Sequence, residues 1–75
     1  MLQFILYGLR KKAGLSQADM AKKLEISEAS YRQKELERSE FKLTEMFKIA
    51  DILDKDISDI FTKTTSRKVN NNQPN

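Results

Sequence analysis

The sequence predicts an all-α fold of five short helices, and three observations support this. The 75 residues are rich in Lys, Glu, Ile and Leu and include only two Gly and one Pro, a composition that favours helices. Apolar residues recur three and four positions apart through most of the first 61 residues, as on one face of a helix. Capping and turn residues divide these stretches into short segments. A chain of this length forms one domain with a modest core.

The first helix is expected over residues 3–13. The side chains expected to face the core lie three and four positions apart: Leu6, Leu9, Ala13 and, extending that face, Leu2 or Ile5. Gly14 follows directly, and its freedom to adopt a left-handed backbone suits the end of a helix.

The second and third helices are expected over residues 17–24 and 28–36, with a tight turn between them. Ser16 and Ser27 precede them as N-caps, because a serine hydroxyl accepts a hydrogen bond from a free backbone N–H group. Asp19, three residues after Ser16, supports the first cap. The apolar side chains expected to fill the wedge between the two helices are Met20, Ala21, Leu24, Ile26 and Tyr31. The third helix otherwise carries polar or small side chains, so one of its faces is available for a binding partner.

The fourth helix is expected over Leu43–Leu53 and the fifth from residue 57, with Asp56 as its N-cap. Six side chains give the fourth helix a broad core-facing stripe: Leu43, Met46, Phe47, Ile49, Ala50 and Leu53. Three more are expected to pack the fifth helix back on the core: Ile57, Ile60 and Phe61.

Periodicity and charge divide the chain into a helical domain at residues 1–61 and a disordered polar tail at residues 62–75. The net charge is +3, but it is unevenly distributed: residues 1–38 and the tail each carry +3, whereas residues 39–61 carry −3. This asymmetry suits a polyanionic partner on one side of the domain.

The residue types present argue against catalysis. The chain has no Cys and no His, so it has no disulfide, no thiolate or imidazole metal ligand and no imidazole general base. It has no Gly-rich phosphate loop, and its carboxylates show no paired-site pattern. We therefore expect no catalytic residue, metal, cofactor or small-molecule ligand, and no enzyme. No apolar run approaches the roughly 18 residues that span a membrane, and the apolar N-terminal stretch lacks the features of a signal peptide, so a cytoplasmic protein is expected.

Segments spread over residues 6–61 resemble the phage-repressor (Cro/cI, XRE-type) helix-turn-helix family. The anchors of this resemblance are Leu6, Arg10, Leu15-Ser16-Gln17, Ala21, Leu24, Ile26-Ser27, Tyr31, Glu35 and the segments LTEMFKIADIL and DISDIF. The resemblance implies a five-helix lambda-repressor-like domain whose helix-turn-helix motif spans residues 17–36. It also implies that the third helix enters the major groove of double-stranded DNA, which is wide enough for one helix.

The resemblance assigns roles to four polar residues. Arg10 and Glu35 match the family positions that form a structural salt bridge, which clamps the first helix to the end of the third. Gln17 matches a position that hydrogen-bonds a DNA phosphate, and Arg38 matches a basic position that grips the DNA backbone.

The outward face of the third helix holds the residues expected to contact bases. Four side chains lie opposite Tyr31 and the core: Glu28, Ala29, Arg32 and Gln33. Gln33 is suited to adenine, Arg32 to guanine or a phosphate, and Ala29 to a thymine methyl group. Glu28 either accepts a hydrogen bond from cytosine N4 or only favours the helix N-terminus. Ser27 either binds a phosphate or serves only as a cap.

Four residues depart from the family pattern. Gly is usual at the positions of Glu25, Glu37 and Asp54, and each non-Gly residue costs roughly 1 kcal/mol if the backbone there is left-handed. An apolar residue is usual at the position of Lys34, whose aliphatic stem is expected to cover the core while its amine reaches water.

Together these residues predict a sequence-specific DNA-binding transcriptional regulator, a bacterial or prophage repressor that binds a palindromic operator on the nucleoid as a homodimer. A single such domain makes few base contacts, so specific binding needs two half-sites about one DNA turn apart. The dimer contact is expected from Phe4, Phe41, Ile57 or Phe61, with core packing as the alternative. Two other functions stay open: a DNA-binding antitoxin of a toxin–antitoxin pair, and a protein-interaction module that has lost operator binding.

Overall fold

The chain is helical over the part that the structure describes. The computed structural model describes residues 3–61, and within them it has five helices and no strand. These are α1 (Phe4–Lys12), α2 (Gln17–Leu24), α3 (Glu28–Glu35), α4 (Leu43–Leu53) and α5 (Ile57–Ile60). The predicted all-α fold of five helices is confirmed.

Some sequence predictions fall outside this range. Leu2, expected on the core face of the first helix, and the expected tail at residues 62–75 both lie outside the described residues. Among residues 3–61, no helix is long and apolar enough to cross a membrane.

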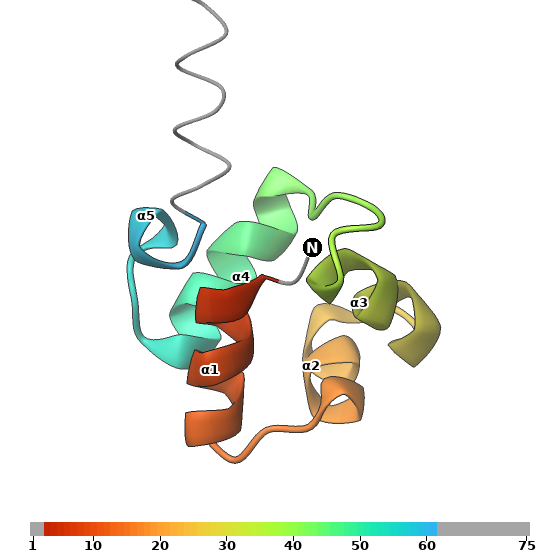
Figure 1. The fold of residues 1–75 in the computed structure, drawn as a ribbon, viewed down its shortest axis with the longest axis horizontal. Coiled ribbons are helices and arrows are strands. Elements are labelled where there is room, and N and C mark those ends of the chain that lie inside the picture. Colours follow the sequence, from red (N-terminus) through yellow and green to blue (C-terminus); the bar gives the residue numbers. More distant parts are fainter. Residues whose placement is uncertain (1–2, 62–75) are drawn as a thin grey trace, which may run out of the picture.

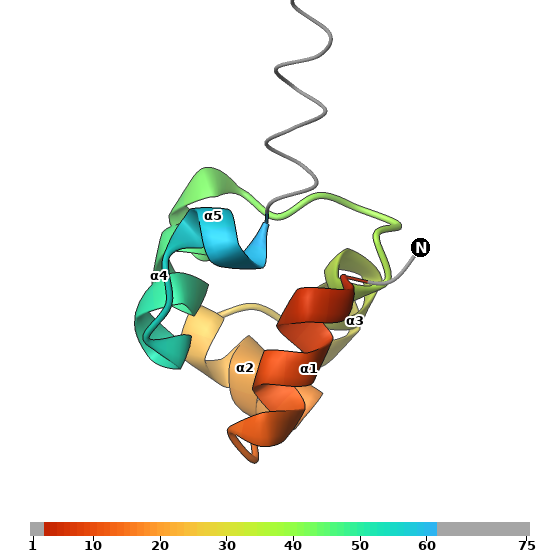
Figure 2. The ribbon, with the colours of Figure 1, turned by 60° about the vertical axis from the view of Figure 1, so that its left-hand side comes forward.

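Two helix pairs form the body of the domain. α2 and α3 pack together on one side, and α4 and α5 pack together on the other (Figure 1). α1 lies in front of the lower part of α4 in that view, and Figure 2 shows α5 beside α4 from a second direction. This arrangement leaves the outer side of α3 uncovered by another helix of residues 3–61.

The helix starts are fixed locally, largely as predicted. The Ser16 hydroxyl accepts a hydrogen bond from the Asp19 backbone N–H at 3.0 Å, and the Asp19 carboxylate accepts one from the Ser16 N–H at 2.9 Å, so the pair forms a reciprocal capping box. The Ser27 hydroxyl accepts from the Ser30 N–H at 3.0 Å. Asp56 occupies the N-cap position of α5, but its side chain makes no cap hydrogen bond, so that part of the prediction is wrong.

The core draws on all five helices and on the loop before α4. Its buried apolar residues are Leu6, Met20, Ala21, Leu24, Tyr31, Phe41, Ile49, Ala50, Ile60 and Phe61. Three aromatic rings contact one another in series. The centroids of Tyr31 and Phe41 are 5.8 Å apart in tilted geometry, and those of Phe41 and Phe61 are 5.6 Å apart in edge-on geometry. Such contacts add about 0.5–1.5 kcal/mol each beyond area burial. Because Phe41 and Phe61 are buried here, neither is available as the expected dimer contact.

The expected core-facing stripe of α4 is wrong at two positions. Leu43 and Phe47 are 62% and 59% exposed. The inward face of α4 is centred instead on Ile49 and includes Glu45, whose carboxylate meets a buried lysine described below. Leu43 and Phe47 project from a different side of the helix, which leaves an exposed apolar pair.

The expected core face of α1 is too wide. Leu6 is buried and Leu9 is half-buried, whereas Ile5 and Ala13 are exposed. Ala13 follows the last residue of α1, so it does not continue the helical face. Ile5 lies about 100° around the helix from Leu6, since a helix has about 3.6 residues per turn.

Four positions in the connections have a left-handed backbone. Gly14 has φ 76°, as expected for the residue that follows a helix end. Glu25, Glu37 and Asp54 have φ values of 60°, 63° and 57°. These three are the positions where the family usually has Gly, so the chain keeps the backbone geometry and accepts the strain of a side chain there.

We expect Glu25→Gly to stabilise the fold by about 0.5–1 kcal/mol, because it removes left-handed strain at an exposed position while adding some unfolded-state entropy. Urea unfolding followed by circular dichroism measures the change. The matched control is Glu40→Gly, at an exposed loop position without a positive φ, where no gain is expected. Equal effects of the two substitutions would contradict the strain assignment.

Candidate nucleic-acid interface

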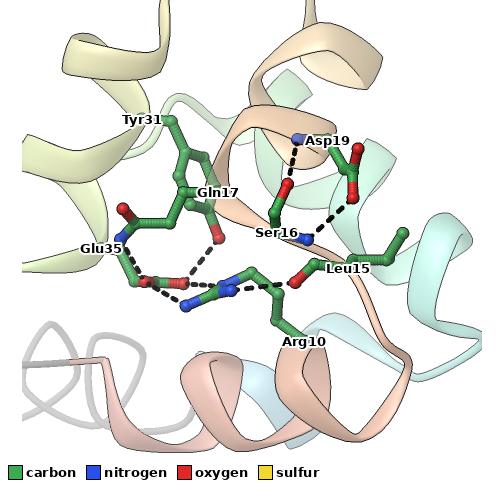
Figure 3. Close-up of polar contacts among 7 residues, drawn as sticks. All are labelled: Arg10, Leu15, Ser16, Gln17, Asp19, Tyr31 and Glu35. Carbon is green, nitrogen blue, oxygen red and sulfur yellow. Dashed lines mark hydrogen bonds and ion pairs between the residues drawn. The ribbon is translucent and has the colours of Figure 1, made fainter.

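A buried carboxylate at the end of α3 joins three helices (Figure 3). Glu35 is fully buried and accepts two hydrogen bonds from Arg10, at 2.8 Å from Nε and 3.1 Å from Nη2. It also accepts from Gln17 Nε2 at 2.9 Å and from the Tyr31 hydroxyl at 2.8 Å. Arg10 Nη1 donates to the Leu15 carbonyl oxygen at 2.9 Å. We call Arg10, Gln17, Tyr31 and Glu35 the Glu35 cluster.

Within the Glu35 cluster, Glu35 and Arg10 stay charged at neutral pH and Tyr31 stays protonated. Burial raises the pKa of the Glu35 carboxyl, but the hydrogen bonds from Arg10, Gln17 and Tyr31 outweigh it and lower the pKa below its ordinary value. Burial lowers the pKa of the Arg10 guanidinium, but the hydrogen bond and charge of Glu35 outweigh burial and raise this pKa above its ordinary value. Burial and the neighbouring carboxylate together raise the pKa of Tyr31, so its hydroxyl remains a donor.

This cluster sets the position of α3 relative to α1 and the start of α2. The bidentate guanidinium–carboxylate contact fixes orientation as well as distance, because both groups are planar. A backbone hydrogen bond from Gln3 N to the Glu35 carbonyl, at 2.9 Å, adds a second link between the start of α1 and the end of α3. The pairing of Arg10 with Glu35 that the family resemblance implied is present in the structure.

A second buried ion pair joins α3 to α4. Lys34 Nζ lies 2.7 Å and 2.8 Å from the two carboxylate oxygens of Glu45, and both residues are buried. The expectation that the Lys34 amine reaches water is therefore wrong. The amine points inward because it pairs with the Glu45 carboxylate on α4. Glu45 also accepts from the Lys42 backbone N–H at 2.8 Å, which supports the start of α4. No local sequence signal identifies this pair, since its members lie on different helices.

The residues predicted to contact bases are all exposed on one side of α3. These are Glu28, Ala29, Arg32 and Gln33, while Tyr31 on the opposite side is buried. Arg32 Nη2 lies 3.5 Å from the Glu28 carboxylate, one helical turn away. Arg38 is exposed in the connection after α3, and its backbone N–H donates to the Gln33 carbonyl at 2.9 Å.

Two of the residues expected at phosphates, Gln17 and Ser27, are each partly engaged. Gln17 donates one amide hydrogen to Glu35, and its NH₂ group carries a second. Ser27 uses its hydroxyl oxygen as the cap of α3, and the hydroxyl hydrogen remains a donor. Both lie at the starts of the two helices of the motif, where backbone N–H groups and the helix dipole favour an anion.

Among residues 3–61, no group of three or more acidic side chains is arranged to hold a metal ion. What the exposed surface of α3 offers is a set of amide, guanidinium, carboxylate and methyl groups on a rigid helix. The amide, guanidinium and carboxylate groups match the hydrogen-bonding edges of bases in a DNA groove, and the methyl group matches the thymine methyl.

The comparison with known families agrees with this geometry. A family model described as helix-turn-helix matches residues 6–60, and the chain belongs to this Cro/cI-like (XRE-type) helix-turn-helix family. No curated protein and no solved structure matches the chain significantly. The family assignment makes the chain a DNA-binding helix-turn-helix regulator.

Arg10→Met is expected to reduce the free energy of unfolding by about 3 kcal/mol or more, because it leaves the Glu35 charge buried without its cationic partner. The double variant Arg10→Met, Glu35→Gln removes both charges and keeps an acceptor for Tyr31, so it is expected to be more stable than the single variant. Urea unfolding of both variants measures the difference. A double variant less stable than Arg10→Met would contradict a buried, charge-coupled pair.

Acid is expected to destabilise the fold below about pH 4.5. The pKa values of Glu35 and Glu45 are lowered in the folded chain, whereas a Glu side chain in the unfolded chain has a pKa of about 4.3. Their contribution to stability is therefore complete above that pH and is lost as the pH falls through the folded-state pKa values.

Urea unfolding at pH 6 and pH 3 measures this acid effect. Glu45→Gln, which removes one of the two carboxyls, is expected to lower stability at pH 6 and to reduce its dependence on pH. The account fails if wild-type stability is the same at both pH values.

Proposed function

We propose that this chain is a sequence-specific double-stranded DNA-binding repressor that acts as a homodimer on a palindromic operator, in the cytoplasm and on the nucleoid. Binding, and not catalysis, is the proposed activity. One observation carries the proposal: in a helix-turn-helix family member, the Glu35 cluster holds α3 so that its polar side faces outward.

In this proposal α3 enters the major groove. Gln33 pairs with the N6 and N7 edge of adenine, and Arg32 donates to O6 and N7 of guanine. Ala29 contacts a thymine methyl group, and Glu28 accepts from cytosine N4. The four residues span the exposed length of α3, so together they read a few neighbouring base pairs.

The ion pair between Glu28 and Arg32 does not prevent this role. Both side chains are about half exposed and their closest atoms are 3.5 Å apart. A pair of this kind contributes only about 0.3–0.5 kcal/mol, whereas a good bidentate base contact discriminates by about 1–3 kcal/mol. Arg32 therefore gains more from a guanine than it loses by leaving Glu28.

Phosphate contacts set the register of α3 on the duplex. Gln17 uses its second amide hydrogen at the start of α2, and Arg38 approaches the backbone beyond the end of α3. Ser27 adds its hydroxyl hydrogen at the start of α3. The reading surface includes the carboxylate of Glu28, so these flanking contacts supply much of the affinity.

The proposed dimer contact uses exposed apolar side chains. Phe4, Leu43 and Phe47 are 70%, 62% and 59% exposed. Large apolar side chains at such exposure mark a protein contact surface when they lie close together, as Leu43 and Phe47 do one turn apart on α4. We take a second copy of the chain as the occupant, because two half-sites require two copies of α3.

Selection from a random duplex library is expected to enrich a palindrome whose half-sites lie about 10 base pairs apart. Gln33→Ala is expected to relax the preference for adenine at one position of each half-site by about 1–3 kcal/mol. The control is Lys48→Ala, exposed on α4, which leaves base preference unchanged. Unchanged base preference in Gln33→Ala, or enrichment of no palindrome, would count against the proposal.

A further inference from the structure

We propose that Tyr7 and Lys11 of α1 bind a DNA backbone phosphate beside the one that Gln17 contacts, so that α1 extends the interface beyond the helix-turn-helix motif. This inference rests on the proposed DNA-binding function. The observation that carries it is a surface groove between α1 and the starts of α2 and α3, whose lining includes Tyr7, Lys11, Ser16, Gln17 and Glu28. The groove therefore runs from the proposed DNA-binding side onto α1.

Two polar groups of α1 in this groove, the Tyr7 hydroxyl and the Lys11 ammonium, are available to bind a ligand. Tyr7 is 39% exposed and Lys11 is exposed. Within residues 3–61, neither the Tyr7 hydroxyl nor the Lys11 ammonium has a hydrogen-bond or ion-pair partner. Arg10 also lines the groove, but its guanidinium is occupied by Glu35 and the Leu15 carbonyl.

The Tyr7 ring favours a position of the Lys11 ammonium near the groove. Lys11 Nζ lies 6.0 Å from the centroid of the ring, and the guanidinium carbon of Arg10 lies 5.2 Å from it. An aromatic face attracts cations, so the ring favours conformations in which Lys11 stays beside it. A hydroxyl donor and an ammonium donor thereby lie together on one wall.

These donors suit a phosphodiester. Phosphate oxygens accept from Tyr hydroxyls and pair with Lys ammonium groups in protein–DNA contacts. Glu28 is the carboxylate in the lining of this groove, and in the proposed complex it accepts a hydrogen bond from cytosine N4. Because Gln17 lines the same groove, a phosphate at Tyr7 and Lys11 belongs to the stretch of backbone that crosses the start of α2.

The test is the salt dependence of binding to a duplex of about 30 base pairs. Lys11→Gln is expected to reduce the slope of log Kobs against log salt by about 1 and to weaken binding about five- to tenfold at 0.1 M salt, equally for all sequences. Tyr7→Phe keeps the ring and is expected to weaken binding a few-fold without changing the slope. The matched control is Lys55→Gln, in the groove between α4 and α5, which should change the slope less.

The outcomes separate this inference from the function on which it rests. If wild type binds the duplex and Lys11→Gln matches Lys55→Gln in slope and affinity, the phosphate site is wrong while the DNA-binding function stands. If wild type binds no duplex at low salt, both are wrong. Lys11 and Tyr7 are at the surface, so neither substitution is expected to disturb the fold. Thermal unfolding of each variant checks this expectation.

Discussion

The buried carboxylate of Glu35 is the constraint on which the arrangement of the first three helices depends. A carboxylate without solvent is stable only if donors replace the water it has lost. Arg10 from α1, Gln17 from α2 and Tyr31 from α3 provide those donors. Each donor comes from a different helix, so satisfying this one charge also fixes the relative positions of three helices.

This constraint has a direct consequence for the interface. Satisfying Glu35 turns Tyr31 inward, and the helical repeat then turns Arg32 and Gln33 outward. Gln17 has two roles in this account: its side-chain amide donates to the buried Glu35, and its place at the start of α2 brings it to the proposed phosphate contact. The second buried pair, Lys34 with Glu45, holds α3 to α4 in the same way. The proposed reading surface is thus carried by a helix tied at two points, although that helix buries few apolar side chains of its own.

The reading surface itself carries no net charge, because Arg32 is balanced by Glu28. Arg32 shares its turn of helix with Glu28, and Glu25 and Glu37 flank α3 at left-handed positions. Affinity in this account therefore comes largely from flanking groups, namely Arg38, the helix starts and the proposed phosphate site on α1. Such a division suits a regulator in which phosphate contacts position the domain and a few side chains select the sequence.

Local features of the fold could be predicted from the sequence, whereas several long-range contacts could not. Capping by Ser16 and Ser27 and the bounds of α2 and α4 depend on neighbouring residues, so the sequence pattern is sufficient. The pairing of Lys34 with Glu45 and the exposure of Leu43 and Phe47 depend on how α4 is rotated against α3, which apolar spacing does not specify. The pairing of Arg10 with Glu35 was accessible only through the family resemblance.

The central claim is that the outward side of α3, positioned by the Glu35 cluster, is the surface that contacts DNA. Titration of the ¹⁵N-labelled chain with a selected duplex, followed by ¹H–¹⁵N correlation spectra, tests it most directly. The account predicts that the largest amide shift changes fall at Gln17 and at residues 28–33. Changes confined to α4 and α5, with residues 28–33 unaffected, would contradict it.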